Sequence, residues 1–271
     1  MSWHTDAPMH LPHHALKWRA VRTLGMCAVA LLASCSANVS VSSTTVVAPT
    51  TDAAPSTTNL CVAPFLDGCN LYGRDLTGAY LEQASLKGSD LRGAKLREIH
   101  AFQAVFENAF LEDADLSGAN LAQANFANAN LLEVNLNGAN LAMALFADAY
   151  LSFASLIGAN GYADFERAEM GHASLDNFRG GGNFRSARMN GVYGLDGDFT
   201  DSVFDGADLT DADMRNAVFE RATFIGANLS SADFSGTDLT DADLTGAIVN
   251  GTTFRNAILD GAKMPEGWKA P

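Results

Sequence analysis

The chain has 271 residues, enough for one large domain or two small ones, and its formal net charge is -14 at pH 7. This acidic balance argues against a general nucleic-acid binder, which needs a basic surface to neutralise phosphates. It is compatible with a protein that mimics a nucleic acid, or with a soluble surface that repels other copies of itself.

Residues 1–34 are predicted to be a signal peptide. Lys17, Arg19 and Arg22 supply a positive region, and the mostly apolar run that follows them is too short to span a bilayer comfortably. The run ends in Leu-Ala-Ser-Cys, which resembles the lipobox of bacterial lipoproteins. In those proteins the cysteine becomes the lipid-modified first residue after cleavage, so the resemblance implies lipidation of Cys35. An ordinary secretory signal with an incidental cysteine is the alternative.

Residues 35–60 are predicted to be a flexible linker. Between Ser36 and Asn59, 11 of the 24 residues are Ser or Thr, and no apolar period is present. A flexible chain of this length spans roughly 25–30 Å, which would hold a following domain just off a membrane.

Two cysteines follow the linker, in the stretch Cys-Val-Ala-Pro-Phe-Leu-Asp-Gly-Cys. In an exported protein such a pair is more often a disulfide than a metal site, and no second pair of Cys or His lies nearby. We therefore expect a Cys61–Cys69 disulfide, in a loop that covers the N-terminal end of the domain that follows.

Residues 61–271 are dominated by a repeat. Large apolar residues recur every five positions from Leu71 to Leu156, and the residue two before each of them is small, usually alanine. A period of five matches neither the 3.6 of a helix nor the 2 of a strand, so the pattern is a repeat of its own kind. It continues in two further phases, from Phe165 to Leu175 and from Phe184 to Met264.

Stretches such as Ala119-Asn120-Leu121 followed by two variable residues show the motif Ala-(Asp/Asn)-Leu-x-x. This motif resembles the consensus of the pentapeptide-repeat family. The resemblance implies an all-β fold, a right-handed quadrilateral β-helix in which five residues make one side and four sides make a coil of 20. About 9–10 coils at ~4.8 Å each would give a rod roughly 45 Å long. Elementary packing agrees, because a five-residue unit cannot bury its leucine alone and must stack on others.

Charged residues support this arrangement in two ways. Of the 29 acids and 13 bases from Asp67 to Glu266, only Arg74 falls at an inward position, as expected if burial excludes unpaired charge. Opposite charges also recur at a separation of one predicted coil, as expected if such residues stack on adjacent coils. The expected ladders are Asp67–Lys87–Glu107, Asp75–Lys95–Asp115, Arg92–Glu112, Arg185–Asp205, Arg188–Asp208, Asp201–Arg221–Asp241 and Asp243–Lys263.

The phase of the repeat slips twice by one residue, so residues 157–183 are predicted to be an irregular break. We expect a kink or bulge near 157–164 and another near 176–183, where glycines can supply positive φ. One interpretation of this break is an evolutionary junction between two repeat arrays. The other is a patch that binds a partner. The candidate patch contains Tyr162, His172, Asn177 and Arg179. Phe110 and Tyr150 are expected to face outward in one column, two coils apart, and form a second candidate strip.

The sequence contains no catalytic or cofactor-binding motif. His100 and His172 belong to no nucleophile or metal-ligand motif, and no glycine-rich phosphate-binding motif occurs. The acidic stretch from Asp196 to Asp213 is a weak candidate for calcium, but its spacing follows the five-residue repeat, which favours a solvated acidic face. We therefore expect a non-enzyme without cofactor or metal.

The preferred hypothesis is a non-catalytic interaction or scaffolding protein, exported and lipid-anchored at the cell membrane or outer envelope, with an unknown partner. Membrane contact is expected through the lipid only, and no direct nucleic-acid binding is expected. The gyrase-protecting members of the family dimerise through C-terminal helices; no such helix pattern follows Met264, so a monomer is expected. The alternative is a DNA mimic that protects a topoisomerase, which requires that the protein is not exported.

Overall fold

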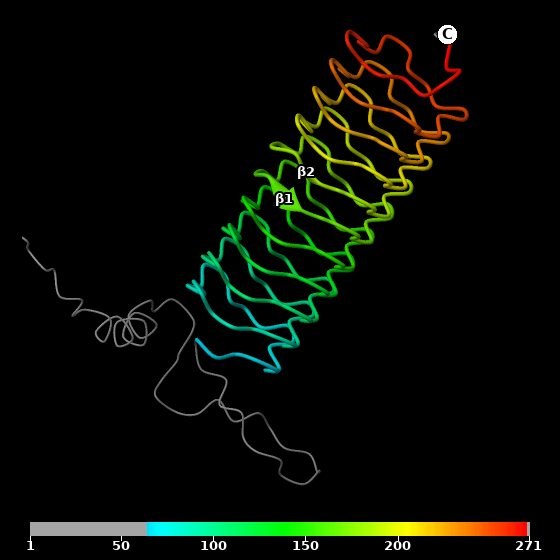
Figure 1. Ribbon diagram of the computed structural model, residues 1–271. Helices are drawn as coiled ribbons and strands as arrows, with labels where there is room; N and C mark the ends of the chain where they lie inside the picture. Colours follow the sequence, from blue (N-terminus) through cyan, green and yellow to red (C-terminus); the bar gives the residue numbers. More distant parts are fainter. Residues whose placement is uncertain (1–63, 270–271) are drawn as a thin grey trace, which may run out of the picture. The chain divides into compact units, whose positions relative to one another are not determined.

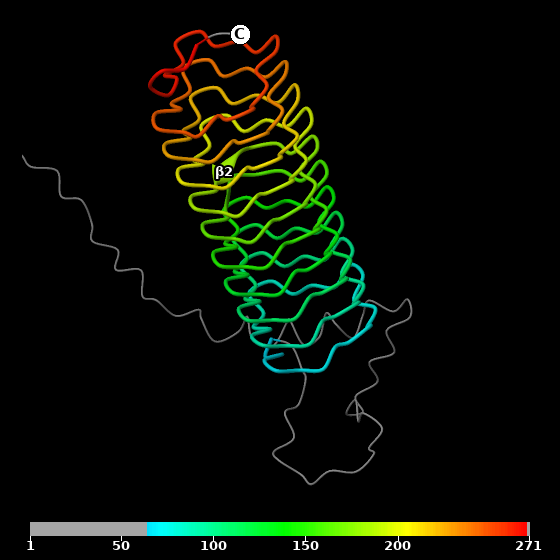
Figure 2. The same cartoon turned by 90° about the vertical axis from the view of Figure 1, so that its right-hand side faces the viewer.

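The computed structural model describes residues 64–269. These residues wind into a stack of four-sided coils (Figures 1 and 2), in which parallel pairing joins residues one coil apart. Ten successive pairings lead from Phe65 to Lys263, so the stack is roughly 48 Å long at ~4.8 Å per strand spacing. The predicted signal peptide, the predicted linker and Cys61 lie outside the described residues.

Each coil has four sides, which we name by the large residue that each side points inward. In one representative coil, Phe126 lies on side A, Leu131 on side B, Leu136 on side C and Leu141 on side D, and the same order repeats along the stack. A corner is named by the two sides that it joins, so the A/B corner follows side A.

A five-residue side consists of one turn and one bridging residue. The N–H of Ala119 donates to the Leu116 carbonyl at 3.1 Å and closes a turn, while the N–H groups of Leu116 and Gly118 donate to the next coil. The second turn residue has positive φ, +66° at Gly118 and between 55° and 61° at the non-glycine positions. A positive φ at this place is the mark of a type II turn and explains the many Gly, Asn and Asp residues there.

Extended strands are almost absent from the described residues, although the fold is built from β-pairing. Only β1 (Ala163–Asp164) and β2 (Gly182–Asn183) are longer than one residue, and they pair in parallel with each other. On the other sides a single residue makes the bridge, because the turn occupies the rest of the five positions. The expected all-β architecture is therefore a ladder of bridges.

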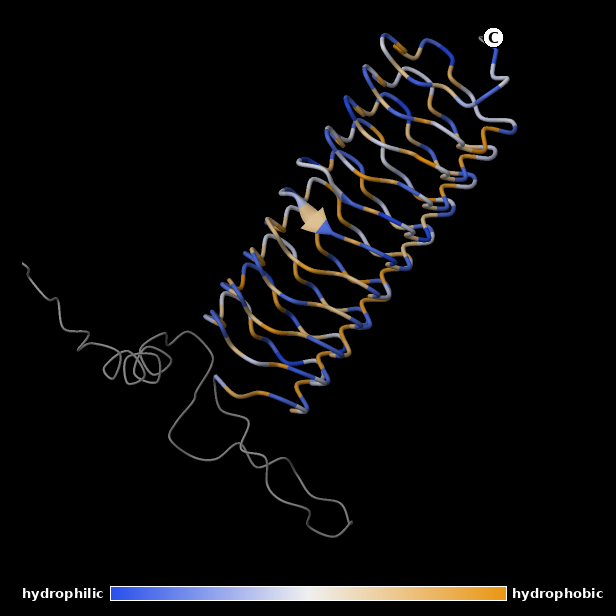
Figure 3. Ribbon diagram, in the orientation of Figure 1, coloured by the Kyte–Doolittle hydropathy of each residue, from blue (hydrophilic) through white to orange (hydrophobic). Residues whose placement is uncertain are grey.

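The inward positions form one continuous apolar core. Figure 3 shows apolar segments recurring along every coil, and most inward side chains are fully buried. On side A, phenylalanine rings stack from coil to coil with centroid distances of 4.6 to 5.0 Å. The stacked rings are Phe106, Phe126, Phe146, Phe165, Phe184, Phe204 and Phe224. Arg74 is the exception to inward burial: it lies in the first coil and is exposed.

Most of the expected charge ladders contain an ion pair between adjacent coils. Those found are Lys87–Glu107 at 2.8 Å, Asp75–Lys95 at 3.6 Å, Arg185–Asp205 at 3.2 Å, Asp201–Arg221 at 2.8 Å and Asp243–Lys263 at 2.9 Å. Two of the seven ladders contain no such pair, and within the three-residue ladders the expected steps Asp67–Lys87, Lys95–Asp115 and Arg221–Asp241 are not ion pairs. Arg92 pairs with Asp90 of its own coil at 2.7 Å, and Arg188 pairs with Glu169 of the preceding coil at 2.5 Å. A long arginine side chain reaches several carboxylates, so spacing alone does not select its partner.

The irregular segment is a pair of shortened D/A corners. Gly161, which is half-buried, and Gly180, which is exposed, stand at the place in the repeat where side D usually has its large inward residue, and one residue, Tyr162 or Gly181, replaces the usual two-residue turn. Across these coils the pairing register is one residue shorter than elsewhere, as in Ala163 with Gly182, and the usual register returns at the pair of Asn183 with Val203. The two slips of phase therefore lie directly on top of each other, at one corner.

Candidate binding surface

The predicted patch residues are distributed around the rod. Tyr162 lies at the D/A corner, His172 at the B/C corner, Asn177 at the C/D corner and Arg179 on side D. These four residues therefore do not form one patch, because the span from Tyr162 to Arg179 covers nearly a whole coil and points its side chains in every direction.

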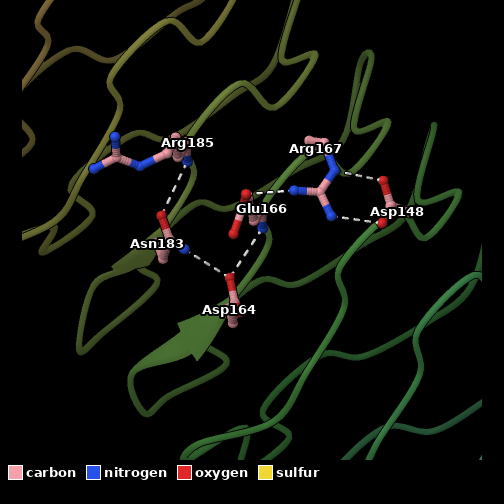
Figure 4. A network of polar contacts seen from close by, with 6 residues as sticks. All are labelled: Asp148, Asp164, Glu166, Arg167, Asn183 and Arg185. Atoms are coloured by element: carbon pink, nitrogen blue, oxygen red, sulfur yellow. Dashed lines mark hydrogen bonds and ion pairs between the residues drawn. The ribbon is translucent and has the colours of Figure 1, made fainter.

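Polar groups beside the shortened corners are paired with one another (Figure 4). Arg167 makes two hydrogen bonds to Asp148, at 2.8 and 2.7 Å, and also contacts Glu166. The Asn183 amide donates to Asp164 at 2.9 Å across the β1–β2 pair. The Arg167 hydrogen bonds lower the pKa of the Asp148 carboxyl. These mutual contacts give the network a structural role in joining coils of unequal length.

The two histidines among residues 64–269 are both stacked on aromatic rings. His100 lies 4.5 Å from Tyr80 on side D, and His172 lies 5.3 Å from Phe153 at the B/C corner, as ring-centroid distances. Burial, followed by the charges of Asp164 and Asp201, raises the pKa of Tyr162. Within residues 64–269, no group of three or more His, Cys, Asp or Glu is placed to hold a metal ion.

The acidic stretch from Asp196 to Asp213 contributes to turns and ion pairs. Asp208 accepts hydrogen bonds from the N–H and the hydroxyl of Thr210, at 3.1 and 2.5 Å, and Asp213 is paired with Arg215 at 2.7 Å. An aspartate that binds the backbone two residues on stabilises the turn that it begins. These contacts agree with the preferred interpretation of a solvated acidic face.

Residues 116–163 form a nearly uncharged region, which we call the neutral belt. Only Glu133 and Asp148 carry charge in this span, and Asp148 is paired with Arg167 at 2.7 Å. This lack of charged residues can be read from the sequence, but the net charge of the whole chain does not reveal it. Large apolar side chains are exposed in the belt: Leu132, Met143, Leu145, Tyr150, Phe153, Ile157 and Tyr162.

A groove of about 450 Å³ runs over side B in and beside the neutral belt. Phe110 and Tyr150 flank Asn130 in one bridged column along the groove, as the period of the repeat predicts, and Glu169 follows Tyr150 in that column. Both aromatic side chains are about half exposed. The remaining lining residues are Asn108, Ala109, Asn128, Leu132, Ser152 and Glu169.

Cys69 is buried and disulfide-bonded. Its predicted partner, Cys61, lies outside the described residues, as does the predicted lipidation site, Cys35, so the pairing and the lipidation stay predictions. Between residues 64 and 269 no helix has the length and apolar character to cross a bilayer.

Comparisons with known proteins agree with this geometry. A family model described as Pentapeptide repeats matches in eight copies, within residues 66–100, 102–138, 129–160, 202–241 and 237–266. The unmatched span between 160 and 202 contains both shortened corners. A search of curated proteins gives no match.

Solved structures of repeat proteins are also similar. HetL, a pentapeptide repeat protein involved in heterocyst differentiation regulation from the cyanobacterium Nostoc sp. strain PCC 7120, is 29% identical over 76% of this chain and 91% of HetL, with a TM-score of 0.51. A trypsin-treated form of QnrB1, a plasmid-mediated fluoroquinolone resistance protein, is 23% identical over 64% of this chain and 85% of its own, with a TM-score of 0.31. Rfr23 from the cyanobacterium Cyanothece 51142 is 16% identical over 75% and 92%, with a TM-score of 0.14. Since the family model matches more than half of the sequence, this chain belongs to the pentapeptide-repeat family.

Proposed function

We propose that this protein is a non-catalytic binding or scaffolding protein of the cell envelope, held at a membrane by a lipid on Cys35. The observation that carries the binding role is the neutral belt. In a chain with a net charge of -14, a span of more than two coils holds two charged residues and seven exposed large apolar side chains. Three of these side chains, Leu132, Tyr150 and Phe153, share side B and its B/C corner, where depletion of charge together with exposed aromatic residues gives the composition of an interface core.

The backbone around the belt suits a presenting role. Its N–H groups donate to the coils before and after it, so the exposed side chains stand on a rigid ladder. Phe153 and Met143 even occupy turn positions with φ of 60° and 59°, which are costly for bulky residues. The same φ occurs at the second turn position throughout the rod, so these two side chains are held outward by the regular turn geometry.

The neutral belt also counts against the alternative of a DNA mimic that protects a topoisomerase. A mimic needs acidic groups spaced along its length like phosphates, whereas the belt interrupts the acidic surface for more than two coils. The motif at Cys35 argues in the same direction, because an exported protein does not meet a cytoplasmic topoisomerase.

Fatty-acid labelling tests the anchored location. Cells that express the full chain are grown with radioactive palmitate, and the protein is purified and tested for label. We expect label on the wild type and none on Cys35→Ser, since the thiol is the proposed acceptor. The anchor is contradicted by an unlabelled wild type or by label that persists in Cys35→Ser.

A further inference from the structure

The groove on side B has the arrangement of a small-ligand site. Its volume, about 450 Å³, lies within the range of ligand pockets in proteins. Phe110 pairs with Asn130, and Asn130 pairs with Tyr150, so the two rings stand two strand spacings apart, roughly 10 Å along the rod. The aromatic pair thus brackets a three-residue column.

The base of the groove is fixed before any ligand arrives. The Asn130 amide donates to the Glu112 carboxylate at 2.7 Å, and its oxygen accepts from the Leu132 N–H at 3.3 Å. A rigid column keeps the spacing between the two rings constant, which lowers the entropic cost of binding.

Charge limits the groove at both ends. Below Phe110 in the same column, Asp90 is held by Arg92 through two hydrogen bonds, at 2.8 and 2.7 Å. Above Tyr150, Glu169 is held by Arg188. Between these neutralised carboxylates the column is uncharged, so the groove fits an uncharged ligand better than an acidic or a basic one.

Four of the six remaining lining residues carry hydrogen-bonding side chains, which lie at the edges of the groove; the other two, Ala109 and Leu132, are apolar. The amides of Asn108 and Asn128 lie on the A/B side of the groove, Ser152 lies on the B/C side and Glu169 closes one end. Amide, hydroxyl and carboxylate groups together can donate bonds to a polyhydroxylated ligand and accept bonds from it. Aromatic faces carry negative charge density, which attracts the polarised C–H groups on the apolar face of a sugar ring.

The spacing selects one kind of glycan. In an extended β-1,4-linked chain, one pyranose residue has about the length of one strand spacing, and alternate residues present the same face. Two rings that are two spacings apart therefore match the spacing of the first and third sugars, which present equivalent faces, and the middle sugar would lie over Asn130. An α-1,4-linked chain curves away from such a straight track.

From this geometry we propose that the side B groove binds a neutral β-1,4-linked glycan, with Phe110 and Tyr150 as stacking platforms. A protein partner fits the groove less well, because Met143, Ile157 and Tyr162 of the neutral belt lie at other corners and cannot join one flat interface with it. The inference rests on the proposed binding function and names its partner, but it does not depend on the lipid anchor.

Isothermal titration calorimetry with the full chain tests the proposal. The probes are cellohexaose and N-acetylchitohexaose, and maltohexaose is the α-linked control. We expect at least one β-linked hexaose to bind and maltohexaose not to bind. Phe110→Ala and Tyr150→Ala should each weaken binding about tenfold, since each removes one stacking platform. Tyr193→Ala, an equally exposed aromatic change on side C, is the matched control and should leave affinity unchanged.

Folding and self-association are measured on the same samples. The three substituted side chains point outward, so melting temperatures should stay close to that of the wild type. The proposal is overturned if neither β-linked hexaose binds, or if the Phe110→Ala/Tyr150→Ala double variant binds as tightly as the wild type. It is also overturned if sedimentation shows a wild-type dimer that this double variant dissociates, because the groove would then be a protein interface. Fatty-acid labelling is unaffected by these outcomes, so failure of the glycan proposal and failure of the anchor can be told apart.

Discussion

Glycine is required at the shortened corners for two separate reasons. Gly161 has a φ of +103°, a conformation that residues with a side chain rarely adopt, and a Cβ on it would lie 2.5 Å from the Ala142 nitrogen. Gly180 stacks on it with a φ of +118°, and its Cβ would lie 2.9 Å from the Gly161 nitrogen. Omitting a residue from the turn brings the backbones of adjacent coils too close together for any side chain.

Gly161→Ala is therefore expected to destabilise the rod far more than a glycine change at an ordinary corner. Gly226→Ala is the matched control, because Gly226 also has positive φ, +66°, but a Cβ there meets nothing within 4 Å. The control should cost about 1–2 kcal/mol for the left-handed conformation alone. Gly161→Ala should cost roughly 1–3 kcal/mol more, as in overpacked cores.

Guanidinium unfolding monitored by circular dichroism measures both variants. Equal losses for Gly161→Ala and Gly226→Ala would show that the close approach at the D/A corner relaxes without cost, contrary to the geometry described above.

Part of this residue-scale detail is readable from the sequence. Counting the period of five locates both slips, and the glycines at 180–182 predict positive φ, which Gly180 and Gly181 have. The sequence does not show that the two slips share one corner, because that requires knowing that the chain between them makes one complete turn of a shortened coil. Nor does it show the crowding at Gly161, which depends on the backbone of the coil below.

At the scale of one side, Phe178 compensates for the glycines. Gly161 and Gly180 leave the inward position of side D without a side chain, and Phe178, two residues before Gly180, is fully buried where alanine is usual. Its ring stacks 5.8 Å from Phe199 and meets the edge of Phe165 at 6.4 Å. Large and small residues have exchanged places on this side.

Phe178→Ala is expected to lower the free energy of unfolding by about 3–5 kcal/mol, since neither glycine can fill the cavity. Phe178→Leu should cost clearly less, because it restores most of the volume. Chemical denaturation gives both values. If Phe178→Ala lowers the free energy of unfolding no more than Phe178→Leu, neighbouring side chains must collapse into the cavity. The Phe178 ring would then not be what fills the core beside Gly161 and Gly180.

The coil illustrates which elements follow from pattern alone. The five-residue period, the exclusion of charge and the ladders of opposite charge predict the inward faces and the pairing register, and the structure has both. The partners of Arg92 and Arg188 are predicted wrongly, because flexible side chains choose among several nearby carboxylates. The side B groove is foreseen only in part: the Phe110–Tyr150 column follows from the period, but the groove's edges come from the two neighbouring corners.

For the whole β-helix, the ends are the places where pairing stops. Within the described residues, the last coil is bridged to the coil before it, as in the Asp243–Lys263 pair, and its other edge faces away from the stack. An open edge invites pairing with another chain. Trp268 lies over this end, half-buried, with its ring 6.1 Å from Phe254 in an edge-on contact.

Trp268→Ala is expected to uncover this end and to favour end-to-end association. Phe254, now 6% exposed, would lose its covering ring, and the bridges of the last coil would open more often. Hydrogen exchange should become faster in residues 249–264 than in the middle of the rod. Sedimentation velocity should show concentration-dependent association that the wild type, which we expect to be a monomer, does not show. Tyr193→Ala, a change of an exposed aromatic residue far from the ends, should alter neither measurement. If Trp268→Ala leaves both exchange and sedimentation unchanged, the tryptophan is not a cap, and the acidic surface alone keeps the ends apart.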